Sequence, residues 1–209
     1  MIFATQFLIL AKRPYRETAL LLDGISPDCG RLSLVLHGGQ KLSEKSFPVA
    51  DLFRELDVEF NDNERSTLHT ATRAELAASF DGIADDPKNY ALAGRIASFL
   101  LKNMQPELPQ PYTYDSFKSV LSQLAGIGDP VDPDAPRWTM EQCSVVIKTA
   151  YLYENGLLPE ARSEEQNDFL ENLVAAGIDN SPLPECAAGY WGALNKWLNT
   201  LLEFHQLSK

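Results

Sequence analysis

The stretch that decides the fold is Ile9–Leu36, ILAKRPYRETALLLDGISPDCGRLSLVL. It contains two strand-like runs joined by a basic and aromatic corner made of Lys12, Arg13, Tyr15 and Arg16. Cations and an aromatic ring at the rim of a small β-barrel suit single-stranded nucleic acid, because cations neutralise phosphates while a ring stacks on an unpaired base. The alternative is a solvated turn on which a tyrosine packs at the edge of the core.

The rest of the first 75 residues follows the same pattern. Short apolar runs with a period of two are separated by turn residues, as is typical of an all-β domain. We predict strands near residues 5–12, 17–23, 31–37, 51–60 and 65–73. The Asn61–Asn63 tip suits a hairpin turn, and five short strands of this spacing fit an OB-type barrel.

After Asp81 the apolar period becomes helical, which predicts a second, α-helical domain. Asp86 suits an N-cap before Pro87, and the pairs Thr139 with Gln142 and Ser163 with Gln166 suit capping boxes. Helices should therefore begin near residues 87, 140 and 164. Residues 160–186 read as a short helix that stops at Gly177, followed by a proline turn. The fold class is α+β, with an OB-fold domain over 1–80 and a helical domain over 81–209.

Charge limits any nucleic-acid binding to one part of the chain. Of the 209 residues, 18 are Lys or Arg and 29 are Asp or Glu, which gives a net charge of −11. Residues 1–50 nevertheless carry a net charge of +2, and residues 51–209 carry −13. DNA binding should therefore be localised and easily screened by salt.

Composition excludes several other classes of protein. No apolar run is long enough to cross a membrane and no leader peptide is recognisable, so we expect a cytoplasmic protein. The three dispersed cysteines fit reduced thiols rather than disulfides. Phosphate-binding loops and catalytic triads are missing, and the acidic pairs fall at predicted helix starts, so we expect neither an enzyme nor a cofactor.

Four blocks of sequence, taken together, resemble the bacterial recombination mediator family RecO. They are LAKRPYRETALLLD (10–23) with CGRLSLVLHGG (29–39), STLHTATRAEL (66–76), the helical stretch 90–125, and LYENGLLPE (152–160) with WLNTLLEFHQL (197–207). The resemblance implies a non-enzymatic DNA repair and recombination protein associated with the bacterial nucleoid. Its partners would be single-stranded DNA, the C-terminal tail of the single-strand-binding protein, RecR and, indirectly, RecA.

The resemblance also assigns residues. Lys12, Arg13, Arg16, Arg31, Lys41 and Lys45 match the family's basic positions, and Tyr15 is the candidate that stacks on a base. The four-cysteine zinc module of many relatives is missing, so we expect no metal. A protein-interaction module that kept the fold with little DNA affinity is the alternative.

The partner surface is predicted from chemistry. An acidic tail with an apolar end needs an apolar pocket with cations at its rim. Arg95, Phe99 and Lys102 share a face of one predicted helix and are our candidates, the alternative being scattered solubilising charges.

Overall fold

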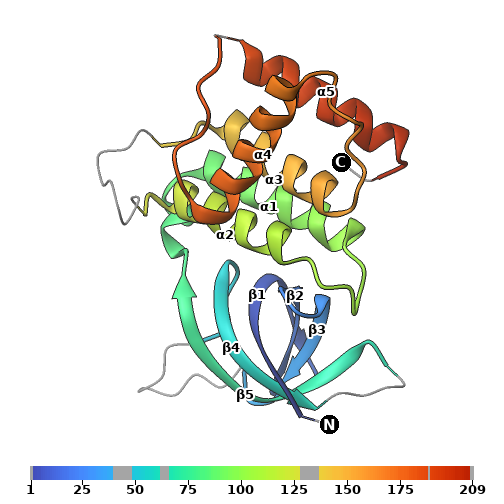
Figure 1. The fold of residues 1–209 in the computed structure, drawn as a ribbon. Helices are drawn as coiled ribbons and strands as arrows, with labels where there is room; N and C mark the ends of the chain where they lie inside the picture. Colours follow the sequence, from blue (N-terminus) through green and yellow to red (C-terminus); the bar gives the residue numbers. More distant parts are fainter. Residues whose placement is uncertain (1, 40–48, 62–65, 128–136, 188, 208–209) are drawn as a thin grey trace. The chain divides into compact units, whose positions relative to one another are not determined.

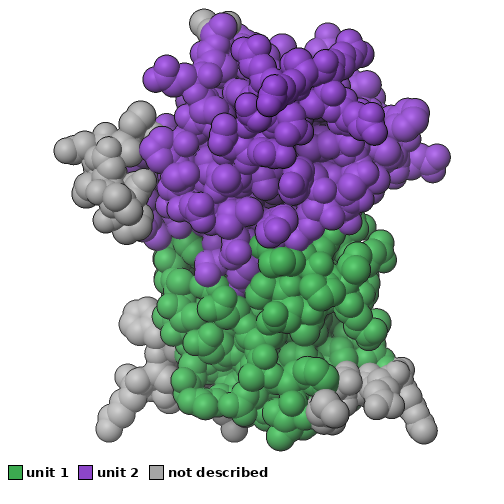
Figure 2. Space-filling model, viewed as in Figure 1, with its two compact units in different colours: residues 1–81, 100–111 green, residues 82–99, 112–209 purple. Residues whose placement is uncertain are grey.

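A computed structural model describes residues 2–39, 49–61, 66–127, 137–187 and 189–207. The chain divides into two compact units, which Figure 2 shows in separate colours. The first contains residues 1–81 and 100–111, and the second contains residues 82–99 and 112–209.

The first unit is a closed five-stranded barrel (Figure 1). Its strands are β1 (Ile2–Tyr15), β2 (Ala19–Ser26), β3 (Gly30–Leu36), β4 (Arg54–Asn61) and β5 (Leu68–Ser79). They close in the order β1-β2-β3-β5-β4, and β3 runs parallel to β5 while the other pairs are antiparallel. The predicted OB-type barrel is confirmed, although the first strand is longer at both ends and the last continues to residue 79.

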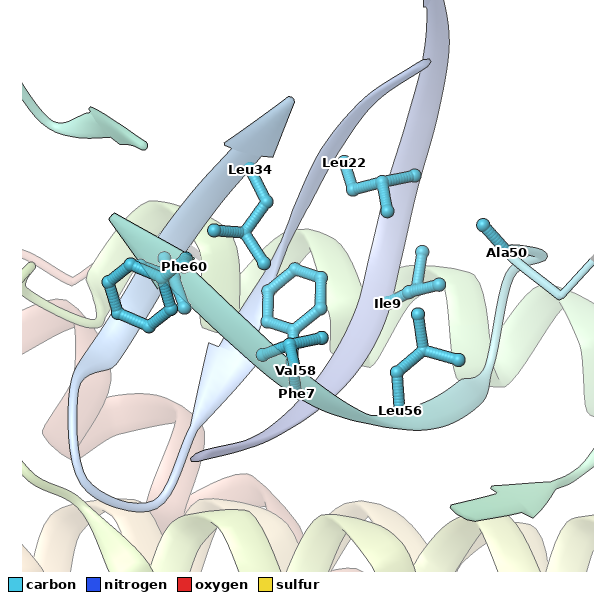
Figure 3. Close-up of a cluster of buried hydrophobic side chains, with 9 residues drawn as sticks. Phe7, Ile9, Leu22, Leu34, Ala50, Leu56, Val58 and Phe60 are labelled. Atoms are coloured by element: carbon cyan, nitrogen blue, oxygen red, sulfur yellow. The ribbon is translucent and has the colours of Figure 1, made fainter. Parts of the chain in front are cut away.

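Buried side chains of β1, β2, β3 and β4 fill the barrel (Figure 3). Phe7 of β1 lies opposite Leu56 of β4, and both are fully buried. The leucines at alternate positions of β3 behave in the same way, since Leu32 and Leu34 join the core and Leu36 packs against it. The period-two pattern therefore separates the core of the barrel from its outer face.

The barrel also holds the segment that follows the first helix. The Arg31 N–H donates to the carbonyl of Gln105 at 3.1 Å, and the Glu107 N–H donates to the carbonyl of Cys29 at 2.9 Å. Gly30 lies between them with a φ of +61°, and a Cβ placed on it would lie 2.3 Å from the Leu108 carbonyl oxygen. Only glycine permits this approach.

The second unit is helical. The helices of the chain are α1 (Pro87–Asn103), α2 (Pro111–Ala125), α3 (Met140–Glu154), α4 (Glu164–Asp179) and α5 (Tyr190–Phe204), after a 3₁₀ turn over Asp81–Asp85. The Asp86 carboxylate accepts from the Lys88 N–H at 2.8 Å, and Thr139 forms the expected capping box with Gln142. Within the described ranges, no helix combines the length and the apolar character that spanning a membrane requires.

Two predictions about α4 are wrong. The Ser163 hydroxyl accepts from the Gln166 N–H, but the Gln166 amide oxygen accepts from the Arg162 N–H, so the capping box is only half formed. Gly177 does not stop the helix, which ends instead with Asn180 in the left-handed region. A Cβ on Gly177 would lie 2.8 Å from side-chain atoms of α2 and α3, so this glycine serves packing.

Candidate nucleic-acid interface

The outer face of the barrel carries a small apolar patch at the turn between β1 and β2. Ala19, Leu21 and Val35 form its buried part, and Tyr15 and Leu68 pack against them. Tyr15 lies opposite Ala19 in the β1–β2 register and is half-buried. The tyrosine is therefore a wall of this patch, and part of its side chain remains accessible.

Arg16 covers that tyrosine. It stands in the turn with a φ of 55°, and its guanidinium carbon lies 5.2 Å from the centre of the Tyr15 ring. This distance is that of a cation–π contact. A base stacking on the same side of the ring would displace the guanidinium, which would then be placed to meet a phosphate.

Lys12 and Arg13 point to opposite sides of β1. Lys12 lies opposite Leu22, which belongs to the barrel core, and its Nζ is 2.6 Å from the Asp51 carboxylate. Arg13 lies opposite Leu21 of the outer patch. Its side chain is 67% exposed, and its guanidinium is 3.7 Å from the Asp23 carboxylate. Arg13 thus shares a face with Tyr15, and Lys12 does not.

The surroundings of the Asp51 carboxyl lower its pKa. Burial, the largest single influence, acts to raise this pKa. The hydrogen bonds from Lys12 and the Leu52 N–H, with the charges of Lys12 and Arg54, together hold the pKa below its ordinary value. The carboxylate stays charged at neutral pH, so Lys12 must break an ion pair before it can bind phosphate.

Arg31 lies away from this corner. It is opposite Ile25, six residues along β2 from the partner of Tyr15, which corresponds to about 20 Å at the rise of a strand. Its Nη1 donates to the Leu101 carbonyl at 2.9 Å. Arg31, predicted as a phosphate contact where the third strand opens, therefore lies apart from the corner of Arg13, Tyr15 and Arg16. Lys41 and Lys45, the other predicted phosphate contacts, lie outside the described residues.

Comparison with known proteins agrees with this barrel. The sequence model of the family described as "Recombination protein O N terminal" matches residues 1–80. Curated proteins named "DNA repair protein RecO" match further along the chain. Residues 1–80 therefore carry the N-terminal domain of the RecO family, and the chain is similar to RecO proteins beyond it.

Three RecO proteins illustrate the similarity. Those of Chromobacterium violaceum, Burkholderia pseudomallei and Cupriavidus pinatubonensis are 30%, 32% and 29% identical over 146, 124 and 117 residues. These alignments cover 66%, 59% and 56% of this chain. They cover 54%, 43% and 39% of the relatives, so the chain spans about half the length, or less, of the curated RecO proteins it matches.

The partner face predicted on the first helix does not expose its apolar residue. Phe99 is only 5% exposed, and its ring meets that of Tyr151 edge to face at 5.2 Å. Arg95 and Lys102 are exposed. Phe99 therefore belongs to the core and cannot present an apolar surface between the two cations.

The cysteines differ in burial. Cys143 is buried, which raises the pKa of its thiol to about 12, whereas Cys29 and Cys186 are half-buried. Across the described ranges, His, Cys, Asp and Glu side chains nowhere gather in threes as a metal would require. The absence of zinc stays a prediction.

One pocket of the barrel was not predicted from the sequence. It has a volume of about 410 Å³ and lies at the Arg31 end, with Phe3, Phe60 and His69 among its lining residues. Phe3 and Phe60 are 57 positions apart and meet only through the β1–β4 register. Nothing local in the sequence marks them as neighbours.

Proposed function

We propose that this chain is a RecO-like recombination mediator in bacterial DNA repair, without an enzymatic activity of its own. It binds single-stranded DNA through the barrel and captures the tail of the single-strand-binding protein. Together with RecR, it assists the loading of RecA in the cytoplasm, near the nucleoid. The observation that carries the proposal is the exposed Arg13 and Arg16 beside Tyr15, on a barrel whose sequence matches the RecO N-terminal domain.

The chemistry of this corner suits a strand of DNA without sequence preference. Arg13 is well exposed, and its 3.7 Å contact with Asp23 is a weak surface ion pair that a phosphate can replace at little cost. Arg16 offers a second cation next to the ring of Tyr15. Competition follows, because DNA phosphates held here are no longer available to the single-strand-binding protein.

A second candidate function is a RecO-fold interaction module with little DNA affinity. Two residues predicted to contact DNA already bind other groups of the barrel unit, which favours this second candidate. Lys12 is paired with Asp51, and Arg31 donates to the Leu101 carbonyl. The charge of −13 on residues 51–209 adds repulsion.

Binding of single-stranded DNA across a salt series tests the proposal. We expect log affinity to fall linearly with log salt for the wild type, and Arg13→Glu with Arg16→Glu to flatten the slope by about 0.7 per lost phosphate contact. The matched control is Lys88→Glu with Lys196→Glu, two exposed lysines of the helical unit, which should leave the slope unchanged. No binding by the wild type at low salt would favour the interaction module. An unchanged slope in the folded arginine variant would move the site elsewhere.

The partner surface is part of the same proposal. Arg95 and Lys102 are exposed and can meet the acidic part of a tail peptide, although the apolar contact must come from residues other than Phe99. Titration of a labelled tail peptide against wild type and Arg95→Glu with Lys102→Glu tests it. Equal affinities would exclude these two cations.

A further inference from the structure

The pocket at the Arg31 end of the barrel is built from aromatic rings and a few charged groups. Its volume is about 410 Å³, and its lining includes Phe3, Asp28, Arg31, Phe60, His69 and Glu107. All of its lining residues belong to the barrel unit. The volume falls within the range of about 300–1,000 Å³ that is usual for small-molecule sites.

The aromatic wall combines rigid rings with an accessible one. Phe60 and His69 are 3% and 7% exposed, and their ring centres are 5.2 Å apart. Phe3 stacks on Phe60 with ring centres 5.9 Å apart and an interplanar angle of 21°, yet it is 40% exposed. Phe3 therefore presents a ring that is held in place from behind and can stack on a flat ligand.

Arg31 supplies hydrogen-bond donors to this pocket. Its Nη1 donates to the Leu101 carbonyl, which fixes the guanidinium, while its Nε and Nη2 donate to none of the described residues. An arginine held on one side in this way can offer its remaining N–H groups as a bidentate donor.

Two carboxylates supply acceptors. Asp28 Oδ2 accepts from the Thr5 hydroxyl at 2.8 Å, and Oδ1 has no partner among the described residues. The Glu107 carboxylate is also without a partner in the described part of the chain, and its residue is anchored by the Glu107 N–H to Cys29 hydrogen bond.

The balance of these groups selects the ligand class. One cation faces two carboxylates, so the pocket has no surplus positive charge with which to hold a phosphate. A flat, neutral heterocycle with both donors and acceptors fits it better. Guanine offers N7 and O6 as a paired acceptor edge for arginine, and its N1–H and N2–H₂ groups can donate to a carboxylate.

We propose that this pocket holds one guanine base of a single-stranded DNA bound to the barrel, stacked on Phe3 and hydrogen-bonded by Arg31 and Asp28. The inference rests on the proposed DNA binding and adds base recognition to it. Phosphates would stay with the corner of Arg13 and Arg16, at the other end of β2.

The experiment compares a thymine oligonucleotide of about 12 nucleotides, within the site size of one OB barrel, with the same strand carrying one central guanine. We expect the guanine to raise affinity about tenfold, as one bidentate contact would. Phe3→Leu and Asp28→Asn should each remove this gain, so that the two strands bind with equal affinity. Asp57→Asn is the matched control, because this exposed carboxylate of the same barrel does not line the pocket.

The outcomes separate the two proposals. Equal affinity for both strands overturns guanine recognition and leaves the proposed function standing, while binding of neither strand overturns both. A guanine gain that Phe3→Leu retains would place base recognition elsewhere and overturn the assignment of this pocket. Thermal unfolding of each variant checks that the barrel is intact.

Discussion

Replacement of Gly30 by alanine should damage the barrel more than its small size suggests. The residue has a φ of +61°, and the new Cβ would lie 2.3 Å and 2.5 Å from the carbonyl oxygens of Leu108 and Gln105. The left-handed backbone costs an alanine about 1 kcal/mol. Relief of the overlap would break the hydrogen bonds from the Arg31 and Glu107 N–H groups, at about 1 kcal/mol each. We therefore expect a loss of about 3 kcal/mol in the free energy of unfolding.

Gly38→Ala is the matched control for this variant. Gly38 has a φ of +75°, but no atom lies within 4 Å of its ideal Cβ, so the change should cost only the backbone strain of about 1 kcal/mol. Urea unfolding, with hydrogen exchange of β3 amides as the barrel reporter, measures both losses. Tryptophan fluorescence would not serve, since all three tryptophans lie beyond residue 111. Equal losses for the two variants would refute the argument from close approach.

Three further predictions concern stability and thiol reactivity. Gly177→Ala should destabilise the helical unit by about 1–3 kcal/mol, because the new Cβ would overpack the contact with α2 and α3. Gly94→Ala, on an open helix surface, is the control and should stabilise the unit by about 0.5–1 kcal/mol. Thermal unfolding measures both changes, and a gain in stability at both sites would contradict the packing role of Gly177. The hydrogen bond from Arg54 is the main cause of the lowered pKa of Asp81, so the pair should stabilise the fold by up to about 1 kcal/mol above pH 4 and lose this as pH falls through the folded pKa. Urea titrations of wild type and Asp81→Asn should converge in acid, and a constant difference at all pH values would argue against the pair. In the native protein at pH 8 a thiol reagent should spare Cys143 and label the other two cysteines, and rapid labelling of all three would contradict its burial.

The parts of the fold that depend on neighbouring residues could be predicted from the sequence. The alternation of leucines along β3 depends on the pleat of one strand, and the Thr139 capping box depends on residues three apart. Contacts between distant segments could not be predicted. The N-terminus of α2, for example, is capped by the Glu154 carboxylate, which accepts the Tyr112 and Thr113 N–H groups across about 40 residues of sequence.

The candidate site shows the same limit. The sequence placed Arg13, Tyr15 and Arg16 at one corner, and these three do share it. Adjacent residues on a strand face opposite sides, so Lys12 leaves the group, and the antiparallel register carries Arg31 to the other end of β2. Helical spacing put Phe99 on one face with Arg95, but it could not tell how much of that face the neighbouring helix covers.

The contacts between residues 29–31 and residues 105–108 limit where genes for related proteins can recombine without a loss of stability. Because residues 100–111 cluster with the barrel, the barrel is discontinuous in sequence although the family match ends at residue 80. A chain shortened to residues 1–80 would expose the backbone N–H of Arg31 and the carbonyl of Cys29, which the missing segment now satisfies. Recombination between related genes at the end of β5 would therefore combine β3 of one parent with residues 105–108 of another. Exchanges that take β3 and residues 105–108 from the same parent should yield the more stable proteins.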